Sequence, residues 1–473
     1  MKLPNLQTKF DEIPFQFVVR ERFRPKSQHL NSRLEALWAA AARRPLDAKS
    51  MARQWSRFLE QNKLPADLAG GLCNMYLGLS PEILAAETID EYVRLVNAHQ
   101  SGILQCRKEL NHYDSHRAEL TSLILPYYVG ETTNPELPLI TRPGWIPEYP
   151  IAMGLAGSEP TFVYEATAQA PIPPRIPGID ATLHEIRRSF SPQGRMTNDE
   201  SYRALEIDVS AKGLRLVCGP GQYFEFHDSC EILGLELSAW ALANQNRSPN
   251  PDGSDLPLRG PPQNIFNLRN RSAVVGVSTL LIALDYEGAD WYFSHERGDE
   301  VAVNRGACSV VPSGTFQPFA TNLAHFDRDF NIRSTVLREF GEELLGKKEF
   351  QETSKRSFDF EKSAILRDFV ELLDAQFAQI YFMGIGLDPV NCVPEVLTTL
   401  IFRASDLPVG TIAKFKSNFE GEFTKHKLTA EALRHFAYKP NVHTASATCA
   451  RLAAKHLDRL VSEVRNRRGR VTA

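Results

Sequence analysis

The chain has 473 residues, of which 43% are hydrophobic and 23% charged, and its formal net charge is −3. This composition is typical of a globular protein of roughly two to three domains, and the charge excludes a whole-molecule attraction to nucleic acid or anionic lipid. No stretch approaches the ~18 apolar residues of a membrane span, and the charged N-terminus lacks a signal-peptide core. We therefore expect a cytoplasmic protein with no membrane partner and, because its seven cysteines are scattered without metal-ligand spacing, reduced thiols.

From about Ser27 to Leu125 the sequence has a helical pattern, which we assign to a domain over residues 1–125. Apolar side chains recur at spacings of three to four, as at Leu30 and Leu34 and again at Trp55 and Phe58. We predict an all-helical domain here, which would bind a partner or a second copy of the chain. No segment is rich in the Arg, Asn and Gln side chains that read base edges, so a nucleic-acid partner is not favoured.

Prolines recur through residues 126–176, where they remove backbone donors and favour extended conformations. This segment is predicted to be a proline-rich linker. Its aromatic residues Tyr127, Tyr128, Trp145 and Tyr149 indicate that part of it is packed rather than solvated.

After residue 176 the hydrophobic period shifts towards two. Short β-branched or aromatic runs bounded by Gly, Pro, Asp or Asn predict strands at 214–217, 274–284, 291–293, 301–303, 309–311, 380–385 and 396–402. Helical patterns lie at 228–244, 331–346, 361–378 and 429–464, the last broken near Pro440. The fold class is therefore predicted to be α+β, with residues 177–270 as an N-terminal extension of a domain over 271–473 that ends in a helix.

The most informative stretch is the predicted helix 331–346. Glu339, Glu342 and Glu343 fall at positions i, i+3 and i+4 and share one face, while an apolar stripe can dock on a sheet. Like charges so close together favour a hard divalent cation among them. Arg338 precedes Glu342 by four residues and can orient it through a charge-assisted hydrogen bond.

Residues Arg338 to Glu343, Arg-Glu-Phe-Gly-Glu-Glu, resemble the second half of the Nudix box. The resemblance implies a Nudix-like α/β/α sandwich with a mixed sheet, preceded by the helical domain, an arrangement loosely similar to actinobacterial regulators. It also implies Mg²⁺ or Mn²⁺ held by Glu339, Glu342 and Glu343. Water would then attack a diphosphate bond of a nucleotide-like small molecule.

The first half of the box departs from the family pattern. The positions of its usual glycine and glutamate hold Ala324 and Phe330, and its last glycine falls on Leu345. A second alignment makes Gly314, in Pro312-Ser313-Gly314, the box glycine followed by a longer loop. The insertion reshapes or disables the site in this alignment.

Two functions are consistent with these residues. The first is a metal-dependent Nudix-type phosphohydrolase acting on a nucleoside diphosphate derivative, in which Glu339 helps to activate water and Arg338 orients the cluster. The second is a catalytically degenerate Nudix-like ligand sensor or regulator, whose helical domain contacts a partner or DNA. No residues are assigned to an organic cofactor.

Two further features have ordinary explanations. Glu395, before the predicted strand 396–402, can act as an additional carboxylate of the site, but is better interpreted as a strand-edge charge. The tail Arg465 to Arg470 holds four arginines in six residues. It can meet an acidic partner, but such tails are usually solvated.

Overall fold

The computed structural model describes residues 89–154, 160–176, 179, 181–190, 197–210, 213–297, 307–318, 329–344, 364–408, 410–415 and 421–467. The helices predicted before residue 89 and the strand predicted at 301–303 lie outside the described residues. By its internal contacts the chain divides into unit 1, Met1–Lys108 with Arg175–Gln193, and unit 2, Glu109–Pro174 with Gly194–Ala473.

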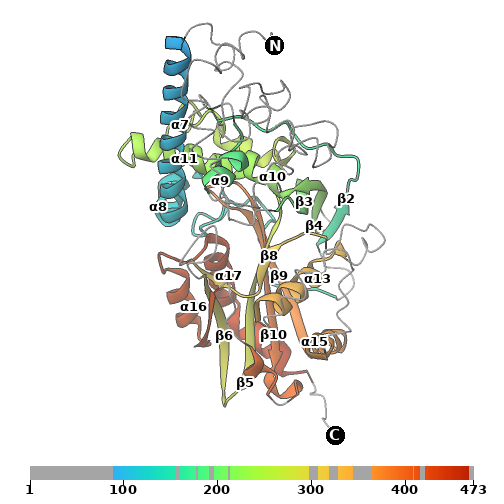
Figure 1. The fold of residues 1–473 in the computed structure, drawn as a ribbon. Coiled ribbons are helices and arrows are strands. Elements are labelled where there is room, and N and C mark those ends of the chain that lie inside the picture. The colour runs from blue at the N-terminus through green and yellow to red at the C-terminus, as the bar shows by residue number, and fades with distance from the viewer. Residues whose placement is uncertain are drawn as a thin grey trace, which may run out of the picture. The chain divides into compact units, whose positions relative to one another are not determined.

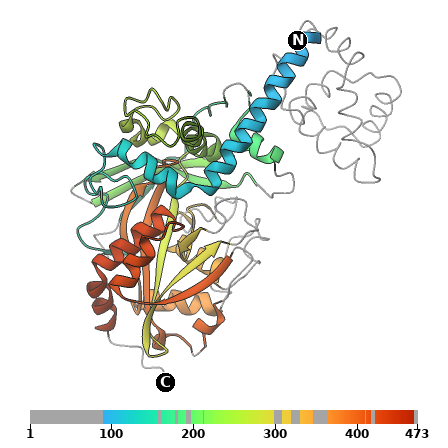
Figure 2. The same cartoon turned by 90° about the vertical axis from the view of Figure 1, so that its left-hand side faces the viewer.

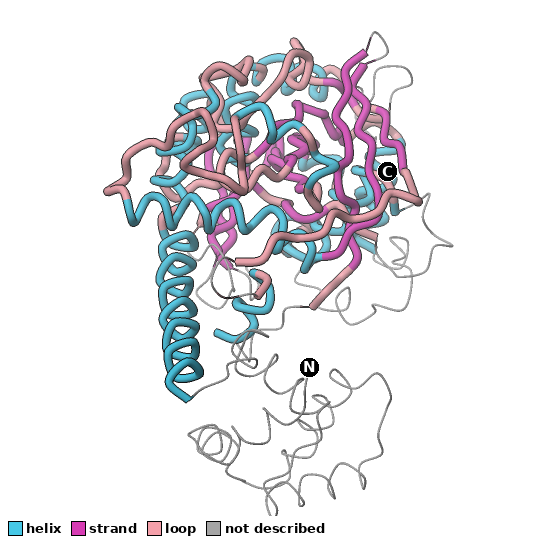
Figure 3. Tube along the Cα trace, turned by 90° about the horizontal axis from the view of Figure 1, so that it is seen from above, coloured by secondary structure: helices cyan, strands magenta, loops and turns pink. Residues whose placement is uncertain are grey.

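The described part of unit 1 is helical. Helix α7 (Ile89–Ser115) is one continuous helix whose last residues belong to unit 2 (Figure 3). Helix α9 (Leu183–Phe190) begins after Thr182, whose backbone N–H donates to the Glu185 carboxylate at 2.9 Å. A Thr followed three residues later by Glu is a common helix start, although α9 was not among the predicted helices.

In the described part of unit 2, seven helical segments follow α7 and come before residue 276, where the first long strand of the large sheet begins. They are α8 (Arg117–Ile124), η2 (Leu125–Tyr128), α10 (Tyr223–Phe226), the wider turn η3 (His227–Glu231), α11 (Ile232–Ala243), η4 (Pro262–Phe266) and η5 (Leu268–Asn270). The predicted helix 228–244 is thus confirmed as η3 and α11.

The large sheet is mixed and has the order β1-β9-β10-β5-β6-β11, with β7 beside β6 and β8 beside β5. Its strands are β1 (Ile151–Ala152), β5 (Gly276–Tyr286), β6 (Ala289–Arg297), β7 (Cys308–Val310), β8 (Ser313–Thr315), β9 (Ala378–Leu387), β10 (Pro394–Arg403) and β11 (Gly421–Lys427). Strands β5 and β10 are parallel, and the other pairs are antiparallel. Every residue of β9 is buried, as expected of a strand covered on both faces.

A smaller sheet has the order β2-β4-β3, formed by β2 (Thr161–Tyr164), β3 (Glu200–Ser210) and β4 (Gly213–Gln222). The sequence predicted part of β4 but neither β2 nor β3. Strand β3 reaches the start of the large sheet, because the Tyr202 N–H donates to the Phe316 carbonyl at 3.1 Å.

Helices cover both faces of the large sheet. Helices α16 (Ala430–Ala437), α17 (Thr444–Lys455) and α18 (Leu457–Arg465) lie on one face, and α13 (Ile332–Glu339), η7 (Phe340–Leu344) and α15 (Ala364–Asp374) on the other (Figures 1 and 2). Leu280 and Ile282 of β5 pack with Leu452 of α17 on the first face. On the second face, the ring of Phe369 of α15 packs tilted against Phe340 and edge-on against Phe402, with ring centroids 4.4 and 5.2 Å away.

These helices confirm most of the predicted ones. The predicted break near Pro440 separates α16 from α17, because proline lacks the N–H that a helix needs. Within the described residues, the fold is therefore α+β with a mixed sheet. None of the helices described there has both the length and the apolar character needed to cross a bilayer.

The predicted proline-rich linker takes part in this fold. Strand β1 pairs with β9 through Ile151 opposite Phe382, and Ile140 bridges to Leu387 of the same strand. Tyr127, Tyr128 and Trp145 are buried as predicted, whereas Tyr149 is half exposed. The Tyr149 ring instead lies 4.7 Å from the guanidinium carbon of Arg459.

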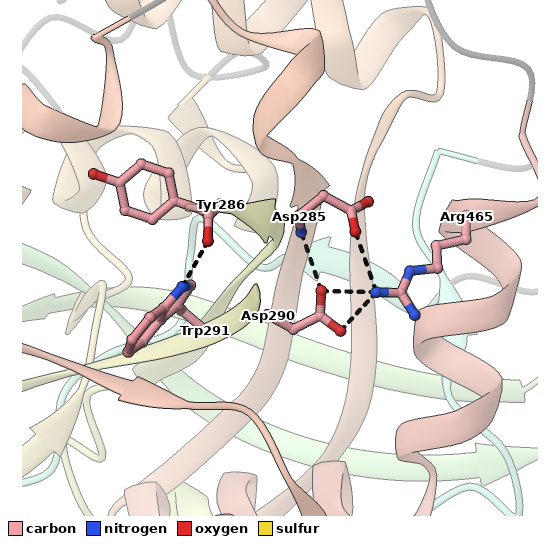
Figure 4. A network of polar contacts seen from close by, with 5 residues as sticks. All are labelled: Asp285, Tyr286, Asp290, Trp291 and Arg465. Carbon is pink, nitrogen blue, oxygen red and sulfur yellow. Dashed lines mark hydrogen bonds and ion pairs between the residues drawn. The ribbon is translucent and has the colours of Figure 1, made fainter. Parts of the chain in front are cut away.

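The arginines at the C-terminal end bind the domain itself. Arg465 Nη2 contacts Asp290 Oδ2 at 2.8 Å and Asp285 Oδ1 at 3.3 Å, at the β5–β6 turn (Figure 4). Arg467 Nη1 donates to the Gln379 side chain at 3.1 Å. Both side chains therefore have partners in unit 2, and the rest of the basic tail lies outside the described residues.

Arg259 is a buried side chain that anchors the β9–β10 turn. Its guanidinium donates to the carbonyls of Pro389 at 2.8 Å and Leu233 at 2.9 Å, to the Tyr128 hydroxyl at 2.6 Å and to the Val390 carbonyl. One side chain thus joins α11, η2 and the turn, satisfying carbonyls that would be costly to bury alone.

Replacing Arg259 with methionine should lower the free energy of unfolding by about 3 kcal/mol, because the buried carbonyls and hydroxyl lose their donor. Arg269→Met is the matched control, since its ion pair with Glu165 is solvent-exposed and contributes less than about 1 kcal/mol. Urea unfolding of both variants measures the difference. Equal losses in the two variants would contradict this role of Arg259.

Candidate functional site

Strand β8 is the element against which the predicted carboxylates lie. Gly314 pairs with Val277 and Thr315 with Gly276, at the start of β5. Helix α13 begins after Asn331, whose side chain accepts the Arg333 N–H at 2.8 Å, as N-cap residues do. The predicted apolar stripe is buried at each of its positions: Ile332, Val336, Phe340 and Leu344.

Arg338 joins two of the carboxylates to β8. Its Nη2 lies 2.5 Å from Glu339 Oε1 and donates to the Thr315 carbonyl at 2.8 Å, while its Nη1 lies 3.4 Å from Glu342 Oε2. Burial alone would lower the pKa of Arg338, but Glu339 and Glu342 raise it, so the guanidinium stays charged. The predicted contact with Glu342 is confirmed.

Glu339 and Glu343 contact β8 directly. The Glu339 carboxylate lies over Gly314 so closely that a Cβ at that position would overlap it. Glu343 Oε2 accepts the Ser313 N–H at 2.9 Å. Three consecutive residues of β8 thus contact Glu343, Glu339 and Arg338. The sequence indicated the helix face and the Pro-Ser-Gly segment but not these contacts between them.

The donor chemistry of this cluster suits a hard divalent cation, because three carboxylates offer oxygen ligands alone. Glu342 is the most accessible of them, with 18% of its side chain exposed. Across the part of the chain that the structure describes, no three His, Cys, Asp or Glu side chains form a group that could hold a metal ion. To bind a cation here, the glutamates would have to give up contacts that they now make with Arg338 or with the Ser313 N–H.

Glu395 does not belong to this cluster. It is the second residue of β10 and pairs with Gly276, whereas Gly314 pairs with Val277. Successive strand residues point to opposite faces, so Glu395 and Glu339 lie on opposite sides of the sheet. The interpretation of Glu395 as a strand-edge charge is also wrong, because β10 is an inner strand and Glu395 is only 8% exposed.

Phe330 lies just before the carboxylate helix, at the position where the Nudix pattern has a glutamate. Its ring centroid lies 4.9 Å from that of Tyr202 and 5.1 Å from that of Phe316, with Tyr164 at 5.6 Å. The side chain therefore belongs to an aromatic cluster that joins β2, β3 and the residue after β8. Ala324 and Leu345, the other departures from the pattern, lie outside the described residues.

Comparison of the sequence with models of protein families and with curated proteins gives no match.

Gly314→Ala should displace the Glu339 carboxylate from Arg338, because the added methyl group would occupy its place. Loss of one charge-assisted hydrogen bond should lower the free energy of unfolding by about 1 to 3 kcal/mol. Gly130→Ala is the control, since a Cβ there meets no atom within 4 Å. Chemical unfolding and a crystal structure of Gly314→Ala check this. Unchanged stability with Glu339 still bound to Arg338 would contradict the geometry.

Proposed function

We propose that the domain built on β8 and α13 is a Nudix-type phosphohydrolase that acts on a nucleoside diphosphate derivative with Mg²⁺ or Mn²⁺ as cofactor. The supporting observation is that Ser313–Thr315 contacts Glu343, Glu339 and Arg338 in turn. In the second alignment of the box, a long loop separates Gly314 from the glutamate helix, and these contacts bring the two segments together. A Nudix-like α/β/α sandwich fits the helices on both faces of the mixed sheet.

Each residue of the cluster has a role in this proposal. Glu339, Glu342 and Glu343 would hold the cation, which when bound neutralises phosphate charge and makes water more acidic. Arg338 fixes the Glu339 carboxylate at 2.5 Å. Glu339 then accepts a proton from the attacking water, as a positioned general base does.

A second function is favoured by Phe330. An aromatic side chain packed against Tyr202 and Phe316 stands where the family pattern has a glutamate, as in a domain that binds a nucleotide-like ligand without cleaving it. The helical domain predicted over the first 125 residues would then respond to the ligand. This sensor shares the ligand class of the hydrolase but not its turnover.

The test is to incubate the full chain with nucleoside diphosphate derivatives and dinucleotides in Mg²⁺, Mn²⁺ or EDTA, and to follow cleavage by mass spectrometry. Wild type should cleave at least one compound only with metal. Glu342→Gln/Glu343→Gln should lose about 100-fold or more of that turnover, since both changes remove a negatively charged ligand. Glu431→Gln, an exposed glutamate on α16, should behave as wild type.

The outcomes separate the two functions. Metal-dependent cleavage that the double variant loses supports the hydrolase. Binding of a compound without cleavage supports the sensor, and neither cleavage nor binding of any compound contradicts both.

A further inference from the structure

A second buried polar cluster lies on the other face of the same strands. Glu395, in β10, rests over Gly276 of β5 so closely that a Cβ on Gly276 would overlap its carboxyl group. Its Oε2 lies 3.4 Å from the Ser278 hydroxyl. Only a glycine leaves room for this carboxyl group between two strands that are buried on both faces.

Asp388, in the β9–β10 turn, is the acidic residue whose charge acts on this carboxyl group. Its Oδ1 accepts the N–H groups of Val390 at 2.9 Å and Asn391 at 3.2 Å, and its Oδ2 accepts the Thr444 hydroxyl at 2.5 Å. Although burial opposes it, Arg117, His443 and these hydrogen bonds lower the pKa of Asp388. Asp388 is therefore the fixed negative charge of the cluster.

Three elements around Glu395 carry titratable groups that interact with it. Asp388 belongs to the turn, Arg117 to α8 and Cys449 to α17. Burial and, to a smaller extent, the charge of Asp388 raise the pKa of Glu395 to about 8, although the Ser278 hydrogen bond and Arg117 lower it in part. Burial also raises the pKa of the Cys449 thiol, so that group stays neutral.

We propose that Glu395 is a proton-binding site of the folded protein, and that release of its proton weakens the junction of the β9–β10 turn and α8 with the sheet. The step is a simple ionisation, in which the carboxyl O–H breaks and the proton passes to solvent. The carboxylate left behind is buried and is repelled by the negative charge of Asp388. Because Asp388 orders the turn through Val390 and Asn391, the turn should loosen first.

The direction of the pH effect on stability follows from the pKa of Glu395 in the folded and in the unfolded chain. An unfolded chain has Glu395 near its ordinary pKa of 4.5, and the folded chain near 8. Between these values the folded state holds one more proton, so this group's contribution to stability is complete below about pH 4.5 and is lost as the pH rises through about 8. The unfolding equilibrium constant should rise by up to about tenfold per pH unit in this window.

The experiment is urea unfolding with amide hydrogen exchange, corrected for intrinsic rates, from about pH 5 to about pH 9. It compares wild type with Glu395→Gln, a neutral mimic of the protonated side chain, and with the exposed-site control Glu431→Gln. Wild type and the control should lose stability with pH and lose protection at Val390 and Asn391, whereas Glu395→Gln should lose much less. The same pH profile in all three proteins would overturn the proposal.

A measurement on the wild type alone covers the case in which Glu395→Gln does not fold. Glutamate labelled with ¹³C at the side-chain carboxyl gives one signal per residue in the folded chain. One signal should titrate with a midpoint near pH 8. If all glutamate signals titrate below about pH 6, Glu395 holds no such proton and the proposal fails.

Discussion

The parallel pairing of β5 with β10 is the constraint on which the rest of unit 2 depends. Glu395 to Arg403 lie in register with Gly276 to Leu284, and a parallel pair of this kind needs cover on both faces. Helices α16 to α18 supply one layer, and α13 and α15 supply the other (Figure 1). Polar side chains buried in such a core need hydrogen-bond or charge partners. The two polar clusters around Glu339 and Glu395 lie at the end of the sheet where β5 and β10 begin.

In both polar clusters a carboxyl group lies directly over a glycine of a strand, where any larger residue would overlap it. Glu339 lies over Gly314 on one face and Glu395 over Gly276 on the other. Their electrostatic surroundings differ, however. Arg338 contacts Glu339 at 2.5 Å and so favours a charged carboxylate, whereas Asp388 repels charge on Glu395. The two faces of one sheet therefore place one carboxylate next to a positive charge and bury one carboxyl group under the influence of a negative charge.

The sequence predicted what depends on local pattern. Strands β5, β9 and β10 are continuous β-branched or aromatic runs, and the stripe from Ile332 to Leu344 marks the buried face of its helix. It missed β3, although Leu205, Ile207 and Val209 alternate with Glu206 and Asp208, because the pattern changes at the register shift between Ala204 and Glu206. It also missed the contact of Arg338 with Glu339, because adjacent residues do not face each other on a regular helix. The burial of Glu395 depends on strand order, which no local pattern encodes.

Binding of a divalent cation by the glutamates beside β8 can be tested without any substrate, by electron paramagnetic resonance of Mn²⁺. Titration of the full chain should show a Mn²⁺ population that is bound by wild type and by Glu431→Gln. That population should be lost in Glu342→Gln/Glu343→Gln, since two of the three carboxylates become neutral amides. Equal binding in all three proteins, or no binding in wild type, would contradict the account.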